Sequence, residues 1–356
     1  MPGRGKYVAI MAGLFISLCV VAFASLFAGR YALSAHDVVQ ILWQGNMPGE
    51  NQARYSVIFN LRAPRVVAVM LVGGGLAVAG ATFQAVLKNA LASPDVLGTS
   101  SASAFGAALG ILLSLPFALS SLLSFLFGVV SLLLVLGICR LKRRQDALTT
   151  ILSGMIIASL FIAFVSVIKY VADPQDTLPA IVFWLMGSFA SVAKAQVYWL
   201  IPLFAACYLT IYRLRWNMNI LSLGDDEARI AGLNPPRLKI LLLIAASLLV
   251  SASVSLAGVV GWVGLVIPHL VRSVLGYNHG RLIPASALSG ALFLLAIDNI
   301  ARGATYAEIP IGILTALIGA PLSRGENPFS TTSVFIWRGA RSSACSGRTA
   351  PVKPRC

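Results

Sequence analysis

Charged residues are scarce in this chain: Asp, Glu, Lys and Arg make up 11 % of its 356 residues. A soluble domain carries about 25 %, so the deficit excludes an ordinary water-soluble enzyme. Hydrophobic residues account for 58 %, which excludes a disordered chain, because disorder requires low hydrophobicity. Acidic residues are outnumbered, 12 against 27 basic ones. Since the basic residues lie between apolar runs, we interpret them as markers of membrane orientation and expect no nucleic-acid partner.

Several catalytic signatures are also missing. The five cysteines form no CxxC pair and the three histidines are scattered, so we predict neither a disulfide framework nor a metal site. No P-loop motif is present to hold ATP phosphates, and no HExxH motif occurs. We therefore expect no enzymatic activity and no cofactor. Asp298 is the one acidic residue within a long apolar run, whereas proton- or sodium-coupled carriers need more ionisable groups at mid-membrane. We therefore interpret Asp298 as a residue that pairs or packs helices, and not as a proton carrier.

What the sequence has in abundance is apolar runs, and about 20 such residues span a bilayer. The sequence predicts an all-α integral membrane protein, a polytopic bundle of about ten transmembrane helices. Some of these are short or broken by Gly and Pro, which transporters tolerate where the backbone lines a cavity. The runs are 8–28, 65–87, 94–114, 117–139, 148–171, 193–212, 238–260, 262–276, 283–301 and 308–322.

The basic residues predict the orientation of these spans. With the N-terminus inside, twenty Lys and Arg residues fall on the inside and seven on the outside. Cytoplasmic loops carry such an excess, so both termini are predicted to be cytoplasmic. This orientation of the C-terminus requires an even number of spans. The number depends on the boundary around 258–276, where one span more or fewer would reverse the orientation of every later span.

Four ordered groups of residues carry the functional signal. The first is Leu61-Arg62-Ala63-Pro64-Arg65, followed by a Gly-rich helix, Gln84 and the stretch from Lys88 to Gly98. The second is Leu223-Gly224-Asp225-Asp226-Glu227-Ala228-Arg229-Ile230-Ala231-Gly232. The third runs from Gly261 to His269 with Arg272, and the fourth runs from Asp298 to Arg302 and on to Pro321.

Together these groups resemble the membrane permeases of ABC importers for iron–siderophore complexes, haem and cobalamin, the FecCD-type permeases. In that family the corresponding motifs are LRxPR, RNPLAxPxxLG, LGDExAxxLG, GFVGLVxPHxxR, ADxxAR and ELPVGxxTAxxGAP. The resemblance runs from about residue 8 to 321, in the same order. It implies a type II ABC importer permease in the inner membrane, dimerised with an identical or related permease subunit. Two cytoplasmic ATP-binding subunits and a periplasmic or lipoprotein substrate-binding protein would complete the importer.

The resemblance also implies roles for residues at the two ends of the bundle. Arg62, Arg65 and Arg302 match motif positions that face carboxylates of the binding protein. Arginine suits that task because its planar fork holds a carboxylate bidentately; the alternative is that these residues snorkel to lipid headgroups. The loop 214–237 matches the family's ATPase-coupling loop, which folds as two short helices. In it, Leu223, Gly224, Asp225, Asp226, Glu227, Ala228, Arg229 and Gly232 are the predicted contact residues.

The same loop can be analysed without the resemblance. The three acids from Asp225 to Glu227 favour a helix N-terminus, and Gly232 before Pro235 favours its end. Ile230 and Leu233 beside Arg229 predict a small amphipathic patch suited to a protein groove. A secondary carrier or channel working without an ATPase is the competing class, and it would not need such a patch.

The small residues of the second span have two interpretations. Gly73, Gly74, Gly75 and Gly80 let helices approach closely in lipid, or they line a translocation path. The same two roles, helix packing or lining of the path, are predicted for Gln84, Pro94 and Gly98. Ser93-Pro94 is predicted to start the next helix, because proline is tolerated in a first turn.

The tail departs from the family pattern. We expect residues 1–322 to form the permease domain and 323–356 to be a disordered, polar and basic tail. An altered reading frame explains such a tail, or Val334–Trp337 returns to the membrane surface. The predicted cargo is a ferric-siderophore-type chelate, with cobalamin, haem or another chelate as the alternatives; whether the dimer is homo- or heterodimeric stays open.

Overall fold

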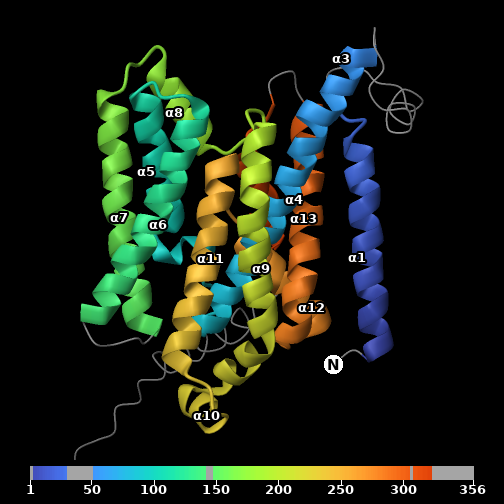
Figure 1. Ribbon diagram of the computed structural model, residues 1–356, viewed down its shortest axis with the longest axis vertical. Coiled ribbons are helices and arrows are strands. Elements are labelled where there is room, and N and C mark those ends of the chain that lie inside the picture. Colours follow the sequence, from blue (N-terminus) through green and yellow to red (C-terminus); the bar gives the residue numbers. More distant parts are fainter. Residues whose placement is uncertain (1–2, 30–50, 142–146, 305–307, 323–356) are drawn as a thin grey trace, which may run out of the picture.

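The computed structural model describes residues 3–29, 51–141, 147–304 and 308–322 (Figure 1). Within these ranges every regular element is helical, which confirms the all-α prediction. The elements are α1 (Arg4–Ser25), α3 (Asn51–Ser56), the π-helix η1 (Val57–Arg62), α4 (Ala63–Val86), the 3-10 turn η2 (Pro94–Leu97), α5 (Thr99–Leu112), α6 (Phe117–Leu141), α7 (Ala147–Val171), α8 (Thr177–Leu185), α9 (Lys194–Leu223), α10 (Asp225–Ile230), α11 (Pro235–Ala257), α12 (Val263–Leu275), α13 (His279–Ala304) and α14 (Ile311–Leu322).

Ten of these helices correspond, in order, to the ten apolar runs. Seven are long and apolar enough to cross a membrane, and three further apolar helices are shorter, at Thr99–Leu112, Val263–Leu275 and Ile311–Pro321. The region around 258–276 separates two helices and does not continue one, because α11 ends at Ala257 and α12 begins at Val263. The expectation of about ten helices, some of them short, is confirmed.

The centre of the bundle is α4 together with α11. Their apolar windows are 72 % and 78 % buried within the protein, against 6 % for α1. Helix α4 contacts α9, α11, α12 and α13, while α1 stands at the edge of the bundle (Figure 1). A helix that is apolar all round is buried in protein or faces lipid, so α4 serves as the core and α1 as a peripheral span.

Glycines allow the central helices to touch backbone to backbone. A Cβ atom on Gly73 would collide with the carbonyl of Gly290 on α13, and one on Gly80 would collide with the carbonyl of Gly264 on α12. Gly75 lies against the ring of Phe204 on α9. Small residues are what permit such close crossings in membranes.

The two ends of the bundle carry different elements. The N-terminal end of α1 and helix α10 lie at one end, and α3 and α8 lie at the other (Figure 1). We call these the α10 end and the α3 end. The sequence did not predict α8, whose nine residues are half the length of a span and gave no separate apolar run.

The expectation of two short helices within 214–237 is wrong. Helix α9 continues through Leu223, so α10 is the single short helix of this segment. Residues 213–223 contain no Gly or Pro to stop a helix. The break comes at Gly224, whose backbone is fully extended (φ 170°, ψ 163°).

Candidate functional site

The α3 end holds a buried ion-pair network that joins α4 to α13 and the chain before α14. Arg65 donates to Asp298 at 2.8 Å and to Glu308 at 2.8 and 2.9 Å. Asp298 has a fully buried side chain and also pairs with Arg302, whose Nε lies 3.0 Å from Oδ2. The interpretation of Asp298 as a helix-pairing residue is therefore confirmed.

Arg62 and Arg302 bind carbonyls at the C-terminal end of α1 and in the residues directly after it. Arg62 donates from Nη1 to Leu26 O at 2.6 Å, and Arg302 donates to the carbonyls of Ser25 and Ala28 at 3.3 and 3.2 Å. The last carbonyls of a helix lack intrahelical donors and carry partial negative charge. The two guanidinium groups thus attach the peripheral span α1 to the bundle, a role that the sequence did not reveal.

The three predicted docking arginines surround one depression. It is open, has a volume of about 310 Å³, and is lined by Arg62, Arg65, Arg302 and Glu308 among others. Arg62 is the last residue of the π-helix η1, and π-helical turns are frequent at functional sites. The arginines are 6–11 % exposed and each has acceptors within the chain, so their contact with a binding protein stays a prediction.

At the opposite end, the short helix α10 begins and ends where the sequence predicted. Asp225, Asp226 and Glu227 occupy its first turn and Arg229 its last. Beyond it, Gly232 adopts a left-handed conformation with φ +79°, and Leu233 N donates to Ala228 O. This C-terminal pattern favours glycine, because other L-residues are strained there.

The predicted coupling loop, residues 214–237, is attached to the bundle through Asp225. Its carboxylate lies 2.6 Å from Lys239 Nζ on α11 and 3.5 Å from Lys88 Nζ, two residues after the end of α4. Partial burial works to raise the pKa of Asp225, but the hydrogen bond and charge of Lys239, with Lys88, outweigh it and lower the pKa. The stretch 88–98 and the coupling loop, separate groups in the sequence, therefore meet in space.

The outer surface of this loop is exposed and mixed in character. Leu223 and Ile230 are 75 % and 88 % exposed, and the Asp226–Arg229 pair is exposed beside them. Leu233 packs against the core, so the predicted patch loses one of its two apolar members and Leu223 replaces it. An exposed apolar pair with flanking charges is typical of a surface that another protein covers.

Removing the Asp225 carboxylate is expected to loosen α10. Asp225→Asn should lower the stability of the permease by at most about 1 kcal/mol at pH 7, because partly exposed pairs are screened. Since its pKa is lowered, the stabilisation is present above the ordinary carboxyl pKa of about 3.9 and disappears as pH falls through the lowered value. Thermal unfolding in a double-mutant cycle with Lys239→Met tests this; additive effects of the two changes would contradict the pairing.

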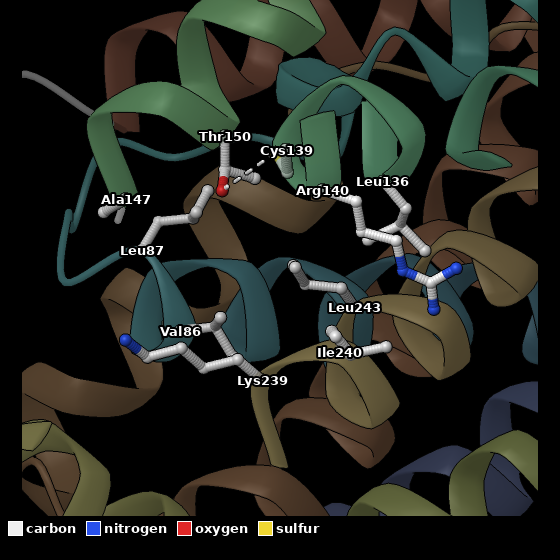
Figure 2. A pocket seen from close by; sticks show the side chains of 10 residues that line it. All are labelled: Val86, Leu87, Leu136, Cys139, Arg140, Ala147, Thr150, Lys239, Ile240 and Leu243. Atoms are coloured by element: carbon white, nitrogen blue, oxygen red, sulfur yellow. Dashed lines mark hydrogen bonds between the residues drawn. The ribbon is translucent and has the colours of Figure 1, made fainter. Parts of the chain in front are cut away.

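A small cleft near this end is not a ligand site. It lies between α4, α6, α7 and α11 and has a volume of about 30 Å³, enough for a water molecule or two. Figure 2 shows that Lys239 and Arg140 present their aliphatic stems to it and turn their charged ends away. Within it, Cys139 Sγ lies 3.8 Å from Thr150 Oγ1.

The remaining predicted residues lie in close helix packing. Gly73 and Gly80 touch α13 and α12, as described above, while Gly74 and Gly75 also border an open groove. The Pro94 ring touches Gly264, and a Cβ on Gly98 would lie 2.8 Å from Ala158 N on α7. Ser93 accepts from Asp95 N, but the turn it opens is a short 3-10 helix and α5 begins only at Thr99. The Gln84 amide is buried, with no hydrogen-bond partner among the described residues.

Comparison with known proteins assigns the family. A sequence model of the FecCD transport family matches residues 17–322. The chain belongs to this family. It is thus a multi-pass membrane permease of the ABC-importer class, in which ATP is hydrolysed by a separate subunit. The match ends at the last described residue, and the predicted tail 323–356 lies outside the part that the structure describes.

Relatives of this permease serve different cargoes. The molybdate import system permease protein MolB of Haemophilus influenzae is 41 % identical over 320 residues, covering 89 % of this chain and 94 % of MolB. The hemin transport system permease protein HmuU of Yersinia pestis is 35 % identical, with 90 % and 96 % covered. A solved metal-chelate type ABC transporter in an inward-facing conformation superposes with a TM-score of 0.79 at 39 % identity, covering 88 % of this chain and 97 % of that one.

Proposed function

We propose that this permease forms the membrane pathway of an ATP-driven importer and that α10 is its contact with the ATP-binding subunits. The exposed surface of Leu223, Ile230 and the Asp226–Arg229 pair carries the proposal, because a soluble partner is what such a surface requires. Asp225 then transmits movement of α10 to α4 and α11 through its two lysines. Two ATP-binding subunits and a second permease subunit, identical or related, complete the membrane assembly.

In this proposal the α10 end is cytoplasmic. The N-terminal end of α1 and helix α10 share that end (Figure 1). The first turn of α1 carries Arg4 and Lys6, and cytoplasmic ends are enriched in Lys and Arg. Both termini are then cytoplasmic and the protein resides in the inner membrane. The α3 end faces a periplasmic or lipoprotein substrate-binding protein.

The open depression at the α3 end is the proposed contact for the binding protein. Three arginines and two carboxylates meet there, which leaves a net positive charge. A carboxylate of the binding protein would enter beside Arg62 and compete for its bond to the Leu26 carbonyl. Arg65→Glu alone is a poor test, because the new carboxylate would also face Asp298 and Glu308 within this chain.

Arg62→Met, which places no negative charge beside the network, tests the contact better. Affinity of the binding protein for the permease in nanodiscs should fall, and that of the unaltered permease should fall as salt is raised. Unchanged affinity in Arg62→Met would contradict the docking assignment. Lys194→Met, an exposed cation at the same end, is the matched control.

The cargo proposed from the sequence is a ferric-siderophore-type iron chelate. Relatives named for hemin, vitamin B12 and iron chelatin transport support a bulky metal chelate. One observation favours a second cargo, molybdate: the 41 % identity to MolB exceeds the 35 % and 38 % shared with the named iron chelatin and vitamin B12 permeases.

Uptake by a strain lacking this gene decides between these cargoes. Complemented and uncomplemented cells are offered labelled ferric siderophore, molybdate, cobalamin and haem in parallel. The proposal expects ATP-dependent uptake of ferric siderophore to return with the gene. Restored uptake of molybdate alone would transfer the assignment to the second cargo, and uptake that persists without the ATP-binding subunits would reject the importer mechanism.

A further inference from the structure

A groove separates the lower half of α1 from α9 and α13, next to the α10 end. Its wider part has a volume of about 900 Å³. It continues into a part of about 450 Å³ that shares Met11, Pro284 and Leu288 with it. We call these two parts together the α1 groove. Both parts are open, and α1 itself stands at the edge of the bundle (Figure 1).

The mouth of the α1 groove is basic and aromatic. It is lined by Arg4 from α1, Arg215 and Trp216 from α9, and Arg281 from α13. No acidic side chain lines either part of the groove among the described residues. Trp and Tyr gather where a membrane meets water, so Trp216 and the nearby Tyr7 place the mouth at headgroup level.

The Arg215 side chain is held in place by its neighbours, but not all of its N–H donors have partners among the described residues. Its guanidinium lies 3.7 Å from the centroid of the Tyr212 ring and donates through Nη1 to Tyr212 O. Its Nε is buried and has no hydrogen-bond partner among the described residues. Across the mouth, the Arg281 guanidinium lies 5.4 Å from the centroid of the Tyr7 ring. A guanidinium carries five N–H donors, and those on its two Nη atoms suit the oxygens of an anionic group such as a phosphate.

Away from the mouth, the α1 groove becomes apolar. Its walls there include Phe15 on α1, Met70 on α4, Ile201 on α9 and Leu288 on α13. Gly74 and Gly75 widen it, because they place no side chain on that face of α4. A cationic mouth that leads into an apolar channel along the spans matches a molecule with an anionic head and hydrocarbon tails.

We propose that the α1 groove binds an anionic phospholipid, with its phosphate at Arg215 and Arg281 and an acyl chain along α4. This rests on the proposed orientation, which places the mouth in the cytoplasmic leaflet, where anionic lipids attract basic residues and basic pockets between helices hold their headgroups. Bound in this way, the lipid fills the space between α1 and the core.

Native mass spectrometry of the purified full chain tests this with two probes of equal acyl length, phosphatidylglycerol and phosphatidylcholine. The unaltered protein should bind phosphatidylglycerol more tightly. Arg281→Met should weaken that binding about fivefold, and Arg215→Met with Arg281→Met about thirtyfold, from the usual contribution of one basic residue near anionic lipid. Arg213→Met, an exposed arginine of α9 outside the groove, is the matched control and should change it little.

A second variant tests the apolar part without changing charge. Ala12→Trp fills the groove from the exposed face of α1 and should weaken both lipids, while leaving the weak binding of inorganic phosphate unchanged. Equal affinity for the two lipids, equal losses in Arg213→Met and Arg281→Met, or full binding of phosphatidylglycerol in Ala12→Trp would each overturn the proposal. The assay uses neither ATPase nor cargo, so its outcome is independent of whether the importer function is correct.

Discussion

Asp298→Ala is expected to destabilise the permease by about 3–5 kcal/mol, because removing one member of a buried ion pair leaves the opposite charge uncompensated. Asp298 is fully buried, and it is the shared partner of Arg65 and Arg302. Its loss leaves two cations against Glu308 alone. Since Arg302 also holds the C-terminal end of α1, the peripheral span should loosen as well. Thermal unfolding of the purified protein in detergent measures the change.

The matched control is Asp226→Ala at the opposite end. Asp226 pairs with Arg229 at 2.7 Å, but both side chains are exposed, and exposed pairs contribute about 0–1 kcal/mol. The expected order is therefore a large fall in unfolding temperature for Asp298→Ala and little change for Asp226→Ala. Equal shifts for the two variants would contradict a structural role for the buried network.

Gly80→Ala is expected to destabilise the protein by about 1–3 kcal/mol or more, the range measured for overpacked cores. Its new Cβ would collide with the Gly264 carbonyl, and backbone cannot rotate away as a side chain can. The crossing of α4 with α12 would have to open. Expression level and thermal unfolding of the purified variant measure the effect.

Gly137→Ala on α6 provides the control for helix propensity. Nothing lies within 4 Å of a Cβ placed there, and alanine is favoured over glycine in a helix by about 1 kcal/mol. This change should therefore be neutral or stabilising. A loss of stability in Gly137→Ala as large as in Gly80→Ala would show that the close crossing is not what matters at Gly80.

The positions of the spans could be predicted because hydropathy is a local property. Each of the ten runs contains enough apolar residues to require lipid or protein around it, and each became a helix. The same reasoning missed α8, which is too short to stand out. It also ended the span 193–212 too early, because polar residues after Arg213 were taken as a loop although nothing in them stops a helix.

The contacts of the candidate site could be predicted only in part. Acids at the start of α10 and glycine after its end are local signals, and both were correct. The partners of Arg65 lie 233 and 243 residues away, and those of Asp225 lie on α11 and two residues after the end of α4. Such pairings depend on how helices pack, which no local pattern specifies. The resemblance brought the motifs together but did not show that the arginines at the α3 end already bind carboxylates and carbonyls of their own chain.

The amount of ATP-binding subunit that co-purifies with an Ile230→Asp permease tests the central claim most directly. Ile230 is 88 % exposed, so its replacement should leave the fold intact, while a covered isoleucine contributes about 1.5–3 kcal/mol to an interface. We expect at least about tenfold weaker association and a matching loss of uptake. Tyr170→Asp, equally exposed at the α3 end, should retain the ATP-binding subunits. Undiminished association in Ile230→Asp would contradict the assignment of α10 as the coupling helix.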